Sequence, residues 1–252
     1  MKLFDLDGRV GIVTGGNGGI GLGIARGLAE AGARVVIAGR DSIKGAAAVA
    51  SLGMTESLFV TADVTSQESC KRLVAEALER FGRLDILVNN AGISIRGAPE
   101  NYTEAEWRAV VDTNLTSTFF CAQAAHPVMK RGGGGKIINI GSVMSVMAAP
   151  YSAPYAASKG GVLQLTRSLA TAWAADNIQV NAILPGWIDT DMTATARAQV
   201  PGLHEKVLAR TPSGRWGEPA DLAGAAVFLA GRASDFVTGA AIPVDGGYMV
   251  LS

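Results

Sequence analysis

The stretch YAASK places Tyr155 and Lys159 four residues apart, with only small side chains between them. On an α-helix, residues at i and i+4 share one face, so the phenol and the ammonium would point the same way. A free tyrosine titrates near about 10, and a close ammonium typically lowers that pKa by about 1–3 units. The pair could therefore serve as a general base, although such pairs also occur by chance on helical surfaces.

A glycine-rich stretch, TGGNGGIG (Thr14–Gly21), directly follows the first apolar run and opens a helical pattern. Glycines allow a tight turn there and let backbone N–H groups approach a pyrophosphate at the positive end of a helix. Two spacings fit: G-x-G-x-x-G through Gly16, Gly18 and Gly21, and G-x-x-x-G-x-G through Gly15, Gly19 and Gly21. In this strand–turn–helix context, either spacing predicts dinucleotide binding.

The end of the second apolar run, AGRD, bears on which dinucleotide is preferred. An acidic residue about 20 residues past the glycines would hold the ribose 2′-OH of NAD, but Gly39 stands there. Arg40 follows, and its guanidinium suits a 2′-phosphate by charge and geometry. Because Asp41 could neutralise Arg40 or approach the ribose itself, the pattern favours NADP and leaves NAD open.

Short β-branched runs alternate along the chain with longer helical patterns. Their near-continuous apolar character is typical of a sheet that is covered on both faces. The expected strands are Arg9–Gly15, Arg34–Gly39, Leu58–Asp63, Leu84–Asn90, Lys136–Ser142, Gln179–Pro185 and a short last one within Ala240–Gly246. The expected helices are Gly19–Ala31, Ile43–Leu52, Gln67–Phe81, Thr103–Arg131, Ala153–Ala175 and Pro219–Ala230.

This alternation predicts an α/β fold, a Rossmann-like doubly wound parallel β-sheet with helices on both faces. We see no linker or repeat, so residues 1–252 are expected to form a single dinucleotide-binding and catalytic domain. The stretch 187–216, rich in Thr, Ala, Pro and Arg, has a weak pattern. A long insertion of this kind after a strand is often a lid, so we expect a substrate flap there.

Composition argues against several other classes of protein. The 22 basic and 22 acidic residues cancel and no basic run occurs, so we expect no nucleic-acid partner. Acidic residues near the start and the lack of about 18 successive apolar residues predict neither export nor membrane insertion, and favour a cytoplasmic location. Cys70 and Cys121 form no motif, and neither His126 nor His204 has a second ligand at metal spacing, so we expect no metal.

Seven motifs occur together and in order: TGGNGGIG, Asp63–Val64, NNAG (Asn89–Gly92), Asn114, Ser142, YAASK and Pro185–Gly186. Taken together they resemble the short-chain dehydrogenase/reductase family over essentially the whole chain. The resemblance implies a catalytic set of Asn114, Ser142, Tyr155 and Lys159. Tyr155 would exchange the proton of an alcohol, Lys159 would tune it and hold the nicotinamide ribose, Ser142 would orient the substrate oxygen, and Asn114 would hold a water that links Lys159 to solvent.

The resemblance also implies the cofactor contacts. Asp63 and Val64 would flank the adenine, Asn90 the ribose, and Ile188 and Thr190 the nicotinamide amide. For Gly92 a plain strand-end turn is as good an interpretation as direct contact. The full expected set is Gly15, Asn17, Gly19, Ile20, Gly21, Arg40, Asp63, Val64, Asn90, Ala91, Gly92, Tyr155, Lys159, Pro185, Gly186, Ile188 and Thr190.

The substrate is less strongly indicated. The stretches SVMS (Ser142–Ser145) and RTPSGRWGEPADLAGAAVFLA resemble the gluconate 5-dehydrogenase and 2-deoxy-gluconate 3-dehydrogenase branch of the family. The substrate would contact Ser142 and Tyr155, and Arg96 could clamp a sugar-acid carboxylate. A solvated loop arginine near Glu100 is the alternative for Arg96.

The sequence thus predicts an NAD(P)-dependent oxidoreductase of a secondary alcohol or ketone, with a sugar acid or polyol as substrate. A reductase of 3-oxoacyl thioesters or other small carbonyl compounds is the alternative, and a non-catalytic dinucleotide sensor is a remote one. The helices around Asn114 and Tyr155 carry small apolar residues on more than one face, which indicates a second buried face. By resemblance, we expect a homotetramer or homodimer.

Overall fold

Seven strands form one parallel sheet in the part of the chain that the computed structural model describes, residues 2–53 and 56–251. The strand order is β3-β2-β1-β4-β5-β6-β7. The strands are β1 (Val10–Thr14), β2 (Arg34–Gly39), β3 (Ser57–Thr61), β4 (Ile86–Asn89), β5 (Gly135–Ile140), β6 (Ile178–Pro185) and β7 (Ala241–Val244). The predicted doubly wound fold is confirmed.

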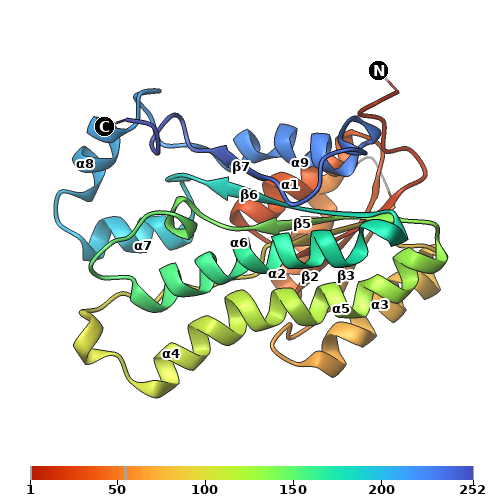
Figure 1. Cartoon of the computed structure of the whole chain (residues 1–252), viewed down its shortest axis with the longest axis horizontal. Helices are drawn as coiled ribbons and strands as arrows, with labels where there is room; N and C mark the ends of the chain where they lie inside the picture. The colour runs from red at the N-terminus through yellow and green to blue at the C-terminus, as the bar shows by residue number, and fades with distance from the viewer. Residues whose placement is uncertain (1, 54–55, 252) are drawn as a thin grey trace.

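Helices cover both faces of this sheet (Figure 1). The α-helices are α1 (Gly19–Glu30), α2 (Ser42–Leu52), α3 (Gln67–Phe81), α4 (Glu104–Val111), α5 (Ser117–Arg131), α6 (Ala153–Trp173), α7 (Asp191–Gln199), α8 (Leu203–Arg210) and α9 (Ala223–Ala230). Successive strand residues point to opposite faces, so Ile12 packs with α3, α5 and α6, whereas Val13 packs with α1, α2 and α9. Two apolar cores result, one on each face.

The strand order reverses direction at β1. Val13 of this strand is in register with Ile37 of β2 on one side and with Val88 of β4 on the other. The connections from β1 and β4 therefore leave towards opposite faces, which opens a crevice at the carboxyl ends of these strands. In an open parallel sheet this crevice is the usual place for a ligand.

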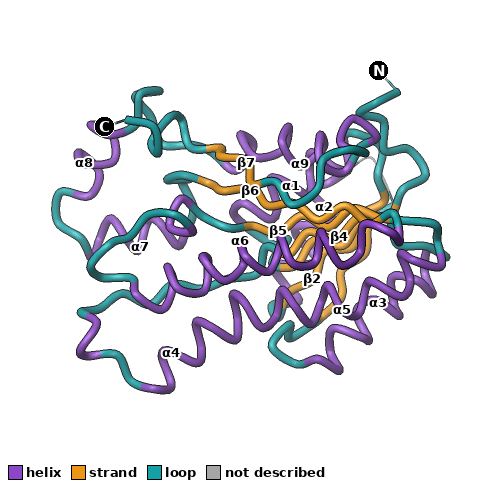
Figure 2. Tube along the Cα trace, in the orientation of Figure 1, coloured by secondary structure: helices purple, strands orange, loops and turns teal. Residues whose placement is uncertain are grey.

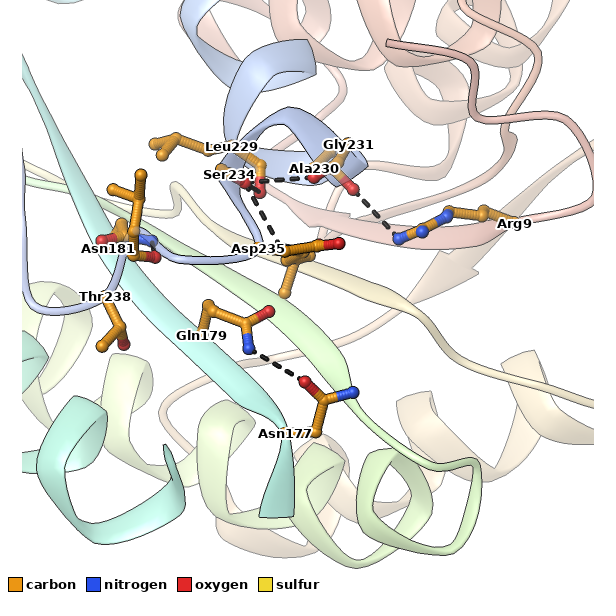
Figure 3. A network of polar contacts seen from close by, with 12 residues as sticks. Arg9, Asn177, Gln179, Asn181, Leu229, Ala230, Gly231, Ser234, Asp235 and Thr238 are labelled. Atoms are coloured by element: carbon orange, nitrogen blue, oxygen red, sulfur yellow. Dashed lines mark hydrogen bonds and ion pairs between the residues drawn. The ribbon is translucent and has the colours of Figure 1, made fainter. Parts of the chain in front are cut away.

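The opposite end of the sheet is held by a polar network (Figure 3). Ser234 Oγ donates to Leu229 O (2.9 Å) at the end of α9, and Asn181 Nδ2 of β6 donates to Val237 O (2.7 Å). Lys136 of β5 is buried, and its Nζ lies 2.8 Å from Asp235 Oδ1. These contacts fix the segment between α9 and β7 and leave the carboxyl ends of the strands free for chemistry.

Two expectations about secondary structure need correction. The single helix expected over Thr103–Arg131 is divided by a π-helical turn, Asp112–Thr116, between α4 and α5. The turn places the Asn114 side chain against the backbone of Ile93, and that contact competes with regular helix geometry. In the weakly patterned stretch 187–216, for which no helix was predicted, the structure has α7 and α8, which lie at one end of the molecule (Figure 2).

The two cysteines are buried, as small apolar residues are expected to be, but their proximity was not predicted. Cys121 Sγ of α5 lies 3.4 Å from Cys70 Sγ of α3, and both are free thiols. Within the described residues, no helix is long and apolar enough to cross a membrane. In the same part of the chain, no group of three or more His, Cys, Asp or Glu residues is arranged to hold a metal.

Candidate active site

A cavity of about 610 Å³ lies along the carboxyl ends of the strands. Its size is within the range typical of cofactor and ligand sites. Its walls come from the glycine-rich turn, the ends of β2 to β6, the first turn of α6 and the start of α7. Residues far apart in the sequence are therefore brought to one crevice.

Tyr155, Lys159 and Ser142 meet at one end of this cavity. Tyr155 and Lys159 share a face in the first turns of α6, where Pro154 suits the helix start. Lys159 is only 4% exposed, and its Nζ donates to Ile140 O at 2.7 Å and lies 5.8 Å from the centre of the Tyr155 ring. The shared helical face predicted from YAASK is therefore observed.

Ser142 and Lys159 are also joined through a neighbouring serine. Ser145 Oγ donates to Lys159 O (2.8 Å) and accepts from Ser142 N (3.2 Å), while Ser142 Oγ accepts from Met144 N (3.1 Å). The SVMS stretch is thus a short capped turn that sets Ser142 against α6. Ser145 has a positioning role here that the sequence did not assign to it.

The electrostatics differ from the expectation that Lys159 lowers the pKa of Tyr155. Removal from water raises the pKa of the Tyr155 phenol, and hydrogen bonding to Ser142 and the charge of Arg96 oppose that rise only in part. Burial lowers the pKa of Lys159 to about 8. The expectation was wrong for the free protein because desolvation penalises both charged forms and because the ammonium points to a carbonyl and the ring rather than to the hydroxyl.

Asn114 lies behind the cavity wall rather than in it. Its Oδ1 accepts from Ile93 N (2.8 Å), and its Nδ2 donates to Ile93 O and Ser158 Oγ, each at 3.0 Å. A Cβ on Gly92 would lie 3.2 Å from Asn114 Oδ1 and 3.6 Å from Lys159 Nζ. Asn114 therefore holds the chain after β4 beside Lys159.

The glycine-rich turn leaves room for a flat, charged ligand group along its backbone. Gly15 has a φ of +62°, and a Cβ there would lie 3.0 Å from Asn90 Nδ2 and 3.1 Å from Ala91 Cα. Asn90 Nδ2 in turn donates to Thr14 O and Gly15 O (3.0 and 3.1 Å). These residues fit a dinucleotide pyrophosphate, because the turn exposes backbone at the start of α1 and no side chain fills the space.

Arg40 lies at the far end of the cavity. Among the described residues, 2–53 and 56–251, it has no hydrogen-bond or ion-pair partner. The carboxylate of Asp41 caps α2, because its Oδ1 accepts from Ile43 N and Lys44 N, both at 3.0 Å. Asp63 accepts from Thr65 N and Thr65 Oγ1, which lowers the pKa of its carboxyl, with a smaller contribution from Arg40. The alternatives in which Asp41 neutralises Arg40 or takes the ribose are not supported by this geometry.

All of the expected cofactor residues except Gly21 line the cavity. The lining includes Gly15, Asn17, Gly19, Ile20, Arg40, Asp63, Val64, Asn90, Ala91, Gly92, Tyr155, Lys159, Pro185, Gly186, Ile188 and Thr190. Gly21 lies behind the wall, where a Cβ would come within 2.4 Å of Asn90 Nδ2, so its role there is close packing. Sequence reasoning missed several lining residues, among them Lys44, Thr65, Ile93, Thr113, Ile140, Gly141, Met192 and Thr193. These residues lie close in the sequence to expected ones, and that closeness is the signal that could have identified them.

Arg96 lies outside the lining but close to the catalytic end. Its charge lowers the pKa values of Tyr155, Tyr151 and Tyr102 against the larger effect of desolvation. It forms no ion pair or hydrogen bond with the described residues, which is compatible both with a carboxylate clamp and with the solvated loop arginine near Glu100. Arg96 is half-buried, and its guanidinium is free to meet an anion.

A doubly wound sheet with an open crevice, a glycine-rich turn and a buried Tyr–Lys pair defines a dinucleotide-binding α/β enzyme. A family model described as enoyl-(acyl carrier protein) reductase matches residues 15–249. The chain belongs to the short-chain dehydrogenase/reductase family of oxidoreductases, and the prediction of an NAD(P)-dependent enzyme of this family is confirmed.

Relatives and solved structures cover the chain almost completely. It is 43% identical over 254 residues to 2-dehydro-3-deoxy-D-gluconate 5-dehydrogenase of Dickeya dadantii, which covers 99% of this chain and 98% of the relative. It is 42% identical over 253 residues to gluconate 5-dehydrogenase of Gluconobacter oxydans, covering 98% and 97%. The crystal structure of a gluconate 5-dehydrogenase from Burkholderia cenocepacia in complex with NADP and tartrate superposes with a TM-score of 0.95, at 41% identity over 100% of this chain and 99% of that one.

Proposed function

We propose that the protein is an NADP-preferring oxidoreductase that interconverts a secondary alcohol and its ketone, with a sugar acid or polyol as substrate. The observation that carries this proposal is the placement of Ser142, Tyr155 and Lys159 at one end of a cavity whose other end presents the unpaired Arg40. The similarity to dehydrogenases of gluconate derivatives supports the substrate class.

NADP supplies the nicotinamide that accepts or gives the hydride. Ser142 orients the substrate oxygen by hydrogen bonding, and Tyr155 transfers the proton to or from that oxygen. In the reductive direction the phenol is ready as a donor, because its raised pKa keeps it protonated at neutral pH. With the cofactor bound, Lys159 would hold the nicotinamide ribose and would stabilise charge on Tyr155. Asn114 fixes the chain beside Lys159 and would hold a water on the path from Lys159 to solvent.

The cofactor-binding residues named above would hold NADP along the crevice, with the pyrophosphate on the turn from Gly15 to Gly19. Arg40 would pair with the 2′-phosphate, for which a planar, charged fork is suited. Gly39 supports this choice, because an acidic residue at that position would repel the phosphate. NAD remains the alternative cofactor, and titration with both distinguishes them.

Arg96 would clamp the carboxylate of a sugar acid. The support is that its guanidinium has no hydrogen-bond or ion-pair partner among the described residues and that its charge lowers the pKa of Tyr155 against the larger effect of desolvation. The segment 187–216, with α7 and α8, would act as a flap over the substrate. A cluster of Ala196, Leu203 and Val207 gives these two helices a small core of their own, which favours movement as one unit.

We also propose a homotetramer or homodimer in the cytoplasm. Trp107 of α4 and Phe119 of α5 are 43% and 38% exposed, which favours burial of these helices against a second copy. Two thiols 3.4 Å apart favour a reducing compartment. Light scattering at micromolar concentration tests the assembly, and a monomer would contradict it.

The function is tested by following nicotinamide absorbance with NADP and NAD against gluconate and related sugar acids, polyols, and 3-oxoacyl thioesters. We expect turnover with NADP and a sugar acid or polyol. Faster turnover of the thioesters would replace the proposed substrate with the alternative one. Cofactor binding without turnover on any class would favour a dinucleotide sensor.

A further inference from the structure

Tyr102 joins two loops at the catalytic end of the cavity. Its Oη lies 3.0 Å from Ile95 O in the loop after β4, and 3.0 Å from Tyr151 O in the loop before α6. Gly97 N also donates to Tyr151 O at 3.1 Å. One hydroxyl proton is thus shared by two carbonyl oxygens, and the two loops are tied together at neighbouring points.

Tyr102 is itself held in place by the start of α4. Thr103 caps this helix: its Oγ1 accepts from Glu106 N (3.2 Å), and Glu106 Oε2 accepts from Thr103 N (2.9 Å). This reciprocal pair satisfies the free donors of the first turn and fixes the residue that precedes it. The ring of Tyr102 also packs against Gly97, where a Cβ would lie 3.8 Å from Tyr102 Cζ.

The tied loop carries Arg96. Its neighbours on both sides are fastened, Ile95 through its carbonyl to Tyr102 and Gly97 through its amide to Tyr151. The guanidinium has no partner of its own among the described residues, so its direction depends on the backbone that carries it. The same loop begins at Gly92 and Ile93, which line the cavity, and the loop to which it is tied leads from Tyr151 to Tyr155, so Arg96 is carried at the catalytic end.

We propose that Tyr102 is a positioning residue that holds Arg96 over the substrate side of Tyr155, so that an anionic group of the substrate meets a preformed cation. The inference rests on the proposed function of Arg96 as a carboxylate clamp. Tyr102 touches neither substrate nor cofactor and acts through the loop. Holding a charged partner in place before binding reduces the entropy cost of binding and aligns the reacting oxygen.

Tyr102→Phe removes only the hydroxyl that joins the loops. We expect KM for a sugar acid to rise about threefold to tenfold, the worth of one net hydrogen bond, with a smaller change in kcat. Arg96→Met should raise the same KM about tenfold to a hundredfold, because a charge-assisted contact is lost. The dissociation constant of NADPH should change less than twofold in Tyr102→Phe, since the bonds of Asn90 to the glycine-rich turn are not among those that the Tyr102 hydroxyl makes.

The decisive measurement is the double variant. If Tyr102 acts through Arg96, Tyr102→Phe adds little to KM in an Arg96→Met background, and its effect on a neutral polyol is smaller than on the sugar acid. Tyr248→Phe is the matched control, since it removes a tyrosine hydroxyl that joins neither loop. Its KM for the sugar acid should change less than that of Tyr102→Phe.

The outcomes separate the two proposals. An unchanged KM in Arg96→Met overturns the carboxylate clamp itself, and with it the inference. A raised KM in Arg96→Met with no change in Tyr102→Phe overturns the positioning role alone. Additive effects in the double variant, or equal losses on sugar acid and polyol, would also overturn it by showing that Tyr102 acts on general loop stability. Thermal unfolding of each variant identifies any that fails to fold. If Tyr102→Phe fails, Thr103→Ala takes its place, since it weakens the cap of α4 that fixes Tyr102.

Discussion

The ammonium nitrogen of Lys159 donates to Ile140 O at 2.7 Å and lies 5.8 Å from the centre of the Tyr155 ring. The two side chains share a helical face, yet the charge of Lys159 is directed to a strand-end carbonyl rather than to the phenol oxygen. Each therefore carries a desolvation cost in the free protein, which raises the pKa of Tyr155 and lowers that of Lys159 to about 8. In the free protein, Tyr155 and Lys159 thus line the same cavity without a hydrogen bond between their side chains.

Tyr155→Phe should remove turnover and leave cofactor binding nearly unchanged. The variant deletes only the hydroxyl that exchanges the proton, and general acid–base catalysis typically contributes about 10²–10⁴ in rate. We expect kcat to fall by at least that factor while the NADPH dissociation constant, followed by fluorescence, changes less than threefold. Near-normal turnover would rule out Tyr155 as the proton donor.

The affinity for NADPH should fall with pH above about 8. Lys159 has a pKa of about 8 in the free protein, and its protonated form makes the stronger, charge-assisted hydrogen bond to the nicotinamide ribose. Since the bound state then favours the proton, the dissociation constant should be flat from pH 7 to about 8 and rise up to tenfold per unit above it. Titrations from pH 7 to 9.5 measure this.

Lys159→Met is the control for that pH dependence. It removes the titrating ammonium, so we expect weaker binding at pH 7 and a dissociation constant that no longer changes with pH. A rise that persists in Lys159→Met would assign the titration to another group. Losses in both binding and rate are expected, because one side chain serves both.

The burial of Lys136 leads to a prediction about the free energy of unfolding. Burial lowers its pKa, and Asp235 opposes that effect across 2.8 Å. Asp235→Ala leaves the ammonium buried without its charged partner and should cost about 1–3 kcal/mol at pH 7. Lys136→Met removes the buried ammonium itself, so it should lower the free energy of unfolding by less than Asp235→Ala does.

The same site should give Asp235→Ala a distinct pH dependence. An unfolded lysine keeps its proton up to about pH 10.4, whereas Lys136 loses its proton earlier in the folded variant. The unfolded state then binds more protons in that window, so stability should rise with pH more steeply than in the wild type. Urea unfolding at pH 7 and 9.5 tests this, and equal costs for the two variants at both pH values would contradict it.

The fold and most of the crevice could be predicted from local patterns. The apolar runs and the glycine-rich turn identify strands whose carboxyl ends must meet, and the resemblance to the family implied that Asn90, Ser142 and Tyr155 join Gly15 along one crevice. Local patterns do not report what a side chain contacts across the fold. The bond of Lys159 to Ile140 and the approach of Cys121 to Cys70 depend on tertiary packing.

The errors have the same origin. The helical pattern continues through Asp112–Thr116, but the contact of Asn114 with Ile93 favours a π turn there. In the stretch 187–216, α7 and α8 have weak periodicity because they pack mainly on each other and on Trp187 and Trp216. The role of Asp41 was left open because the sequence shows only that its charge is next to Arg40. In the structure its carboxylate caps α2.

Arg40→Ala should weaken NADP binding and leave NAD binding almost unchanged. Arg40 lines the cavity without a hydrogen-bond or ion-pair partner in the described part of the chain, and the Asp41 carboxylate caps α2 through Oδ1 rather than pairing with it. An exposed, charge-assisted contact with a 2′-phosphate should be worth about tenfold in affinity. NAD offers no phosphate there, so its dissociation constant should change less than twofold.

Gly39→Asp is the complementary variant. A carboxylate at this position would accept from the ribose hydroxyls and repel a 2′-phosphate, so the preference should shift towards NAD. The structure adds a condition, because a Cβ on Gly39 would lie 3.0 Å from Asn17 Cγ and Nδ2. The end of the Asn17 side chain must therefore turn aside, and Gly39→Ala controls for that displacement. Equal losses of NADP and NAD in Arg40→Ala, or a wild type that prefers NAD, would overturn the NADP assignment and leave the catalytic residues unaffected.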